Sequence, residues 1–259
     1  MPVEYKHTNF YKVELAVNKI LIILSLVLLA ACSSKEIPRE NLVARQGILY
    51  EVNSQTPFTG VTVEYHENGQ LEIKGNWKDG KQFGLFEHFH ENGRLAARAN
   101  WKNNKLDGLF EGFHENGQFR TRENRIGGRL EGLVEEYFDN GQLMTKINYK
   151  DGKAEDGLRK KYYKNGQLDS KHYIINNEVH GLEEWYHENG QLWIKRYYKD
   201  GKKDGLEESY LENGQLETKR NYKDGKLDGL YWHFRENGQL SFKKCKKDGK
   251  KTDMTYCER

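Results

Sequence analysis

Residues 181–204 read GLEEWYHENGQLWIKRYYKDGKKD, and residues 205–228 read GLEESYLENGQLETKRNYKDGKLD. The two stretches are copies of one unit, which occurs eight times in the 259-residue chain. Successive copies begin 24 residues apart, except for one step of 25. Residues 60–252 therefore form a repeat array, and one unit decides the fold. The copies begin at Gly60, Gly84, Gly108, Gly132, Gly157, Gly181, Gly205 and Gly229.

Apolar residues recur at odd positions of the unit when its first glycine is numbered zero. In the sixth copy these are Leu182 at position 1, Tyr186 at position 5, Leu192 at position 11 and Tyr198 at position 17. Position 5 is aromatic in all eight copies, and positions 1 and 11 are leucine in seven. A period of two is typical of strands with one buried face. We therefore expect these four positions to share one face of a sheet.

Each unit also carries two turn signals. Asn-Gly between two alternating runs is a strong hairpin signal, because glycine readily takes positive φ and asparagine tolerates it. A second turn is Asp-Gly in five copies. The sequence predicts an all-β fold: an elongated antiparallel β-meander of about eight hairpins and 16 strands in a single twisted sheet. The first turns are Asn68-Gly69, Asn92-Gly93, Asn116-Gly117, Asn140-Gly141, Asn165-Gly166, Asn189-Gly190, Asn213-Gly214 and Asn237-Gly238.

Two pairings of the hairpin are open. A symmetric closure places position 3, often glutamate, opposite position 14, which is always basic, and gives a ladder of weak ion pairs. The alternative pairs position 5 with position 11 through a three-residue loop with a bulge at the glycine. We favour the second, because burial of aromatic side chains outweighs exposed ion pairs. The charged rows then remain solvated surface.

The repeats, of the form G-L-x-E-x-Y-x-E-N-G-Q-L-x-x-K-x-x-Y-K-D-G-K-x-D, resemble bacterial MORN-repeat variants. The resemblance covers all eight units, and similar chains are grouped as a YwqK-type antitoxin family. It implies a repeat surface that binds a partner, and MORN repeats have also been linked to lipid binding. A fold by itself does not fix a function.

The N-terminus has the features of an export signal. Residues 20–31 are uncharged and mostly apolar, follow Lys19, and are too short to span a bilayer. Residues 29–32 read Leu-Ala-Ala-Cys, which resembles the lipobox of bacterial lipoproteins. The resemblance implies lipid attachment at Cys32 and a location at the cell membrane or outer membrane, facing the periplasm or exterior. The alternative is an uncleaved anchor helix.

Domain boundaries follow from these features. We expect residues 1–31 to be a signal peptide and residues 32–46 a tether. Residues 47–59 are expected to form an N-terminal cap or partial repeat, residues 60–252 the eight repeats, and residues 253–259 a C-terminal cap. We interpret that last segment as a partial closing strand over the final sheet edge.

The two remaining cysteines, Cys245 and Cys257, would be oxidised in an exported protein. A wide loop near Lys251 would bring them opposite each other. A tight turn would instead pair Cys245 with Thr252 and leave the thiols too far apart. We expect the wide loop and a disulfide; the alternative is two free thiols.

Several classes of chemistry lack a signal in the sequence. The net charge of +3 argues against a nucleic-acid partner. No catalytic motif occurs, and no cofactor or metal site is expected. Histidine precedes four of the Glu-Asn-Gly turns. A zinc-binding H-E-x-x-H motif would need a second histidine four residues later, and none of the four copies has one, so we expect these histidines to face solvent. These residues are His66, His90, His114 and His187.

The functional expectation is a non-enzymatic protein-interaction scaffold, anchored at the cell envelope through lipid, with an unknown protein partner. One alternative is an antitoxin or immunity-like protein that neutralises a toxin by direct binding. Another is a glycan- or lipid-binding envelope module. The aromatic residues at positions 5 and 17 are expected to be core, or alternatively a binding stripe.

Overall fold

The computed structural model describes residues 36–258. The expected signal peptide and Cys32 lie outside these residues. The chain divides into Met1–Glu36 and Ile37–Arg259, and the second unit carries the whole repeat array. Within the described range, none of the helices has the length and apolar character needed to cross a membrane.

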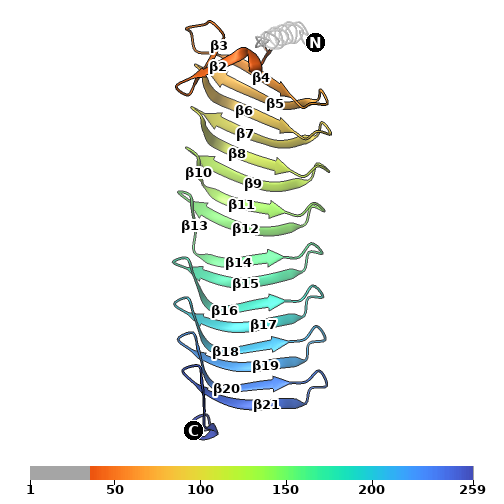
Figure 1. Ribbon diagram of the computed structural model, residues 1–259, viewed down its shortest axis with the longest axis vertical. Helices are drawn as coiled ribbons and strands as arrows, with labels where there is room; N and C mark the ends of the chain where they lie inside the picture. Colours follow the sequence, from red (N-terminus) through yellow and green to blue (C-terminus); the bar gives the residue numbers. More distant parts are fainter. Residues whose placement is uncertain (1–35, 259) are drawn as a thin grey trace, which may run out of the picture. The chain divides into compact units, whose positions relative to one another are not determined.

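Almost every described element is a strand, and strands β4 to β21 follow one another along the sheet in chain order (Figure 1). The expected meander is therefore present. Its strand number is 20 rather than 16, because β1 pairs with β4, β22 is added at the end, and two strands are split in the middle. The elements are β1 (Glu36–Pro38), η1 (Arg39–Asn41), β2 (Leu42–Arg45), β3 (Ile48–Glu51), β4 (Gly60–Tyr65), β5 (Leu71–Lys78), β6 (Lys81–Phe89), β7 (Leu95–Lys102), β8 (Lys105–Phe113), β9 (Phe119–Ile126), β10 (Arg129–Leu130), β11 (Gly132–Tyr137), β12 (Leu143–Lys150), β13 (Lys153–Ala154), β14 (Gly157–Tyr162), β15 (Leu168–Ile175), β16 (Glu178–Tyr186), β17 (Leu192–Lys199), β18 (Lys202–Tyr210), β19 (Leu216–Lys223), β20 (Lys226–Phe234), β21 (Leu240–Lys247), β22 (Lys250–Thr252) and η2 (Met254–Tyr256).

The hairpin register combines the two pairings that the sequence left open. In β16 and β17, Tyr186 lies opposite Leu192, and Glu184 lies opposite Lys195. A bulge makes both possible, because Trp193, at position 12, is the extra residue between them. The same shift recurs in every repeat hairpin, as in β4 and β5.

This bulge corrects the expectation that positions 1, 5, 11 and 17 share one face. One extra residue reverses the alternation, so position 17 lies on the opposite face of the sheet from position 5. Ring contacts agree: Phe113 at position 5 stacks on Phe119 at position 11, with centroids 5.0 Å apart. We call the side with positions 1, 3, 5, 11, 14 and 16 the leucine face, and the side with positions 2, 4, 13, 15 and 17 the tryptophan face.

The two kinds of turn have different geometry and lie along opposite edges of the sheet (Figure 1). At the first turn only the glycine has positive φ, +83° at Gly190, and the His187 N–H donates to the Gln191 carbonyl across a three-residue loop. At the second turn both central residues have positive φ, as at Asp200 (49°) and Gly201 (71°). This is the tight two-residue turn that Asp-Gly favours.

The N-terminal cap is larger than expected. Ile37, Leu42, Leu49 and Phe58 are buried together, and Trp77 packs against them. The Leu49 N–H donates to the Gly80 carbonyl at 2.9 Å, which ties the cap to the first repeat. Residues 36–46 therefore belong to the cap, and the prediction of a tether up to residue 46 is wrong. Ile37 and Leu42 are buried in this cluster although Pro38 lies between them in the sequence.

The C-terminal cap differs from both parts of its prediction. A tight turn at Asp248 and Gly249 leads into β22, and Cys245 lies opposite Thr252. The wide loop is therefore wrong, and residues 254–256 form a 3-10 turn instead of a closing strand.

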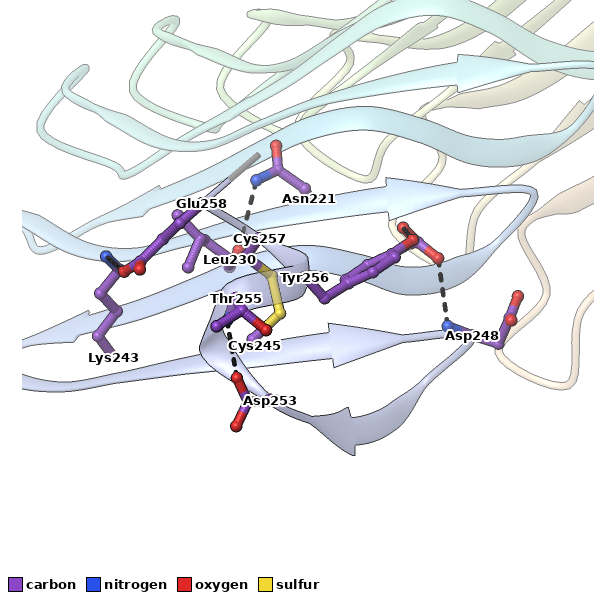
Figure 2. The surroundings of a disulfide bond; sticks show 11 residues. Asn221, Leu230, Lys243, Cys245, Asp248, Asp253, Thr255, Tyr256, Cys257 and Glu258 are labelled. Atoms are coloured by element: carbon purple, nitrogen blue, oxygen red, sulfur yellow. Dashed lines mark hydrogen bonds and ion pairs between the residues drawn. A yellow bond between two sulfur atoms is a disulfide. The ribbon is translucent and has the colours of Figure 1, made fainter.

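The structure nevertheless joins Cys245 and Cys257 in a disulfide, with Cα atoms 6.0 Å apart (Figure 2). The chain reverses after β22, because the Asp253 side chain accepts a hydrogen bond from the Thr255 N–H and starts the 3-10 turn. This reversal returns residue 257 to β21. The tight turn therefore does not separate the two thiols, contrary to our sequence argument.

Candidate interaction surfaces

The Asn-Gly turns lie along one side of the sheet, which we call the first-turn edge, and the Asp-Gly turns lie along the other, the second-turn edge. Side chains of the first-turn edge reach the next repeat and link the repeats. The His66 Nε2 atom lies 2.9 Å from the Phe89 carbonyl oxygen, and His90, His114 and His187 make the same contact one repeat on. In the fifth repeat the Tyr163 hydroxyl replaces histidine and donates to the Tyr186 carbonyl at 2.6 Å. These histidines are part-buried links between repeats, so the expectation that they face solvent is wrong.

Neither turn edge brings metal-ligating residues together. Among residues 36–258, no group of three or more His, Cys, Asp or Glu side chains is placed to hold a metal ion.

Asparagine of the first turn also reaches the next repeat, as where the Asn68 amide donates to the Glu91 carbonyl at 2.9 Å. Asn-Gly recurs in all eight units, and this recurrence is the sequence signal for the link. From the sequence we attributed it to turn geometry alone.

The second-turn edge has a corresponding link that the sequence analysis missed. The Asp204 carboxylate accepts a hydrogen bond from the Asp224 N–H at 3.2 Å, and Asp228 accepts one from Asp248 in the next repeat. Asp107 and Asp156 act in the same way on residues 127 and 176. The signal was the aspartate that recurs just before the first glycine of four units.

A ladder of ion pairs crosses the leucine face at positions 3 and 14. Glu111 lies between Arg98 (2.5 Å) and Arg122 (3.3 Å), and its side chain is only 3% exposed. Glu208 lies between Lys195 (3.8 Å) and Lys219 (3.2 Å). The expectation of fully solvated charged rows is therefore wrong for these glutamates. Position 14 is basic in all eight repeats and position 3 is glutamate in five, so the ladder keeps an excess of positive charge.

A partly exposed row runs beside this ladder at positions 1 and 16, where the apolar residue at position 1 lies opposite asparagine in five repeats, tyrosine in two and cysteine in the last. Leu85, Leu109, Leu133 and Leu158 are 39–46% exposed. Tyr173, which pairs with Leu158, is 51% exposed, and Tyr197 is also exposed. The aromatic residues at position 5 are mostly half-buried, and the charge ladder at positions 3 and 14 separates them from the exposed residues at positions 1 and 16.

The tryptophan face changes character along the sheet. Trp77, Phe86 and Trp101 form an aromatic run near the N-terminal cap, with neighbouring centroids 5.6 and 5.8 Å apart. Towards the C-terminus, buried Glu207 contacts Lys203 at 2.5 Å and Arg220 at 3.2 Å. These side chains of the tryptophan face therefore contact one another.

A second acid–base contact on the same face involves Glu183 and Arg196. Burial lowers the pKa of the Arg196 guanidinium, but the hydrogen bond and charge of Glu183 outweigh burial and raise the pKa above its usual value. Glu183 and Arg196 on this face therefore form an ion pair with each other.

The two turn edges carry opposite charges. Position 7, beside the first turn, is acidic in seven repeats, and position 21, after the second turn, is basic in seven. We call these rows the acidic edge and the basic edge. The acidic edge consists of Glu67, Glu91, Glu115, Asp139, Glu188, Glu212 and Glu236, and the basic edge of Lys81, Lys105, Arg129, Lys153, Lys202, Lys226 and Lys250.

A family model described as MORN repeat variant matches six segments that together make up just over half of the chain. The matched residues are 58–79, 84–103, 130–151, 155–176, 179–200 and 203–224. The chain belongs to the MORN repeat variant family. A comparison with curated proteins found no match.

The third and eighth MORN units are outside the matched segments, yet they form the same hairpins, β8–β9 and β20–β21. Both lack an aromatic residue at position 17, where they carry Arg125 and Lys246. MORN repeats are typically protein- or membrane-interaction modules, and proteins built from them are generally non-enzymatic scaffolds.

Proposed function

We propose that this chain is a non-enzymatic scaffold that binds a partner protein along its leucine face and is held at the cell envelope by lipid on Cys32. The observation that carries the proposal is the set of exposed leucines at position 1 of the second to fifth repeats, together with Tyr173 and Tyr197 at position 16. Exposed apolar side chains that recur along one face in this way are characteristic of binding sites.

The structure of the row favours an extended partner. Equivalent leucines recur once per hairpin, or about every 10 Å. Tyrosine side chains such as Tyr173 add area and a hydroxyl group, which is the chemistry enriched in protein-binding hot spots. The neighbouring charge ladder joins the strands and keeps more basic than acidic side chains, so a partner would meet the apolar row beside a positively charged strip.

A photo-crosslinking experiment in intact cells tests the binding face. A photoreactive phenylalanine derivative is placed at Leu133 or Tyr173 on the leucine face, and at exposed Glu136 on the tryptophan face as the control. We expect the same protein adduct from both leucine-face positions and none from Glu136. Adducts from all three positions, or from Glu136 alone, would contradict the proposal.

A second arm links the adduct to the apolar row. The double variant Leu133→Ser, Tyr173→Ser should keep its thermal stability, because both side chains are exposed, and should lose the adduct formed from a probe at Leu158. Retention of the adduct refutes binding through this row. A partner that is lethal when expressed alone identifies the immunity role, and an adduct with glycan or lipid alone overturns protein binding.

The anchor is tested at Cys32. One acyl chain holds a protein on a membrane only marginally, so lipoprotein processing would need to supply more than one. We expect Cys32→Ser to abolish incorporation of labelled fatty acid and to leave precursor or released protein. Full-length wild-type protein that retains residues 1–31 and carries no label would refute the anchor.

A further inference from the structure

The acidic and basic edges are matched repeat by repeat. Position 7 and position 21 of the same unit have opposite signs in all eight units. The fifth unit is the informative one, because it reverses both signs: Lys164 stands in the acidic row and Glu178 stands in the basic row. The two exceptions therefore compensate each other.

Contact within one chain does not account for this match. The two rows lie at opposite ends of strands such as β17, which has eight residues and so spans about 26 Å. Charges interact in physiological salt over a screening length of about 8 Å. Lys164 and Glu178 are therefore too far apart across the sheet for an ion pair within one molecule to explain why both charges are reversed.

The basic edge also contains local repulsion. Lys199 lies directly opposite Lys202, and Lys223 lies directly opposite Lys226. Like charges in directly opposed positions destabilise a hairpin. All four lysines are exposed, and none forms an ion pair with another residue in the range 36–258. The arrangement costs stability in the isolated chain and favours an anionic neighbour.

Most carboxylates of the acidic edge are equally free. Glu188, Glu212 and Glu236 are exposed and form no ion pair within the described part of the chain. The exception is Asp139, which pairs with Lys164 of the next repeat at 2.5 Å and has its pKa lowered by that hydrogen bond. In the basic row Arg129 lies 3.8 Å from Asp151. Apart from this pair and that of Asp139, the chain presents an acidic row and a basic row with one common spacing.

We propose that copies of this chain associate side by side, with the acidic edge of one copy against the basic edge of the next, in parallel orientation and in register. Both rows advance by one hairpin per repeat, so one alignment matches all eight units. In that alignment Lys164 of one copy meets Glu178 of the next. The contact joins different edges, so each copy keeps one free acidic or basic edge and can bind a further copy.

A long polyanion is a less suitable occupant of the basic edge, because it would meet Glu178 in the middle of the row. Exposed ion pairs are individually weak and are screened by salt. Association should therefore depend on several repeats at once and should decrease steeply as the ionic strength rises.

Zero-length cross-linking gives a direct test on the full chain in detergent at low salt. Equal amounts of 15N-labelled and unlabelled protein are mixed and treated with a carbodiimide, which forms amide bonds between contacting lysine and carboxylate groups. We expect adducts between residues of the same repeat, such as Glu212 with Lys226, that join a labelled to an unlabelled peptide. Adducts confined to single chains, or joining equal edges, overturn the proposal.

Charge reversal in the fifth repeat provides the matched control. Lys164→Glu should weaken association several-fold in sedimentation velocity, and Lys164→Glu, Glu178→Lys should restore it. The double variant does not restore the intrachain pair with Asp139, so recovery distinguishes contact between copies from contact along one edge. Failure of the double variant to recover means that the reversal serves only the pair with Asp139.

Two further measurements separate this inference from the proposed partner binding. The variant Leu133→Ser, Tyr173→Ser should associate like the wild type, because its substitutions lie on the leucine face. Loss of association in that variant, or association that persists in 1 M salt, overturns edge-to-edge contact. A chain that remains monomeric at low salt but binds added polyphosphate also overturns it, in favour of a polyanion.

Discussion

Two consecutive tyrosines show how one hydroxyl group links neighbouring repeats. The Tyr163 hydroxyl donates to the Tyr186 carbonyl of the next hairpin. The Tyr162 hydroxyl makes no hydrogen bond with another residue in the described range. Tyr163 occupies the position at which four other repeats carry histidine, so one contact is made by two side-chain types.

We expect Tyr163→Phe to lower the free energy of unfolding by about 1 kcal/mol, because a half-buried carbonyl loses its donor. Tyr162→Phe, the matched control, should change it by much less. Urea denaturation followed by circular dichroism measures both variants. Equal losses in the two would show that the Tyr163 contact between repeats contributes no stability of its own.

Tyr210 predicts a pH-dependent contribution to stability. Burial, and then the hydrogen bond and charge of Glu208, raise the pKa of Tyr210 to about 12. An unfolded tyrosine titrates near pH ~10. The folded state therefore holds the proton more tightly, so this contribution is complete below about pH 10 and is lost as the pH rises towards 12.

Tyr210→Phe tests this sign. Its stability difference from the wild type should be constant below pH 10 and should shrink between pH 10 and 12, as measured by urea denaturation. A Tyr210 difference that stays constant to pH 12 would contradict the raised pKa.

At the scale of the element, the sequence predicted the hairpins and misplaced one face. Turn chemistry was sufficient for the meander, because Asn-Gly and Asp-Gly each specify a local conformation. Strict alternation failed at position 12, where residues such as Trp193 form the bulge. Nothing in a period-two pattern marks one extra residue, so position 17 was assigned to the wrong face, and the exposed leucine and tyrosine row was missed.

The same limit explains the caps. The tight turn at Asp248 was predictable from its chemistry, but the reversal after Thr252 depends on a side-chain hydrogen bond at Asp253. The buried cluster at Ile37 and Leu42 depends on Trp77, more than thirty residues away. Contacts of this range leave no local periodic signal.

The C-terminal element predicts a local effect of reduction. The disulfide closes a segment with a sequence separation of 12 residues, for which the chain-entropy model gives roughly 3 kcal/mol. Cys257→Ser should accelerate hydrogen exchange in β21 and β22 and leave β4 to β9 unchanged, because each repeat contacts only its neighbours. The pairing in the mature protein stays a prediction.

Alkylation of denatured, non-reduced protein checks that pairing directly. Cys245 and Cys257 should both resist modification until a reductant is added. Modification of both without reductant would show two free thiols. Faster exchange throughout the sheet in Cys257→Ser would instead contradict the local character of the cap.

At the scale of the molecule, the repeats carry two sets of interactions that extend in one dimension. Turn links and the charge ladder each join a residue of one hairpin to a residue at a different position in the next hairpin. The stability of such an array is approximately a sum of unit and neighbour terms. The array should therefore tolerate a change in the number of units provided that each new junction has the same pairs of residues.

Deletion of residues 181–204 tests this property. It removes one whole unit and brings the fifth repeat against the seventh. The Tyr163 hydroxyl then meets the Tyr210 carbonyl in place of that of Tyr186, and Lys171 meets Glu208 in place of Glu184. We expect the shortened chain to keep its far-UV circular dichroism per residue and to unfold cooperatively with a modest loss of stability.

Deletion of residues 188–199 is the matched control, because it removes half a unit. It removes β17 and joins β16 to β18, which run in the same direction in the wild type, through the turn at Asp200 and Gly201. Later first turns would therefore fall on the edge that holds second turns, and the links across both edges would lose their partners. We expect rapid hydrogen exchange in β19 to β21 in this variant and native-like protection in the whole-unit deletion. Equal protection in the two would show that the edge links do not set the register of the array, whereas loss of protection in both would show that the sixth unit is not interchangeable with its neighbours.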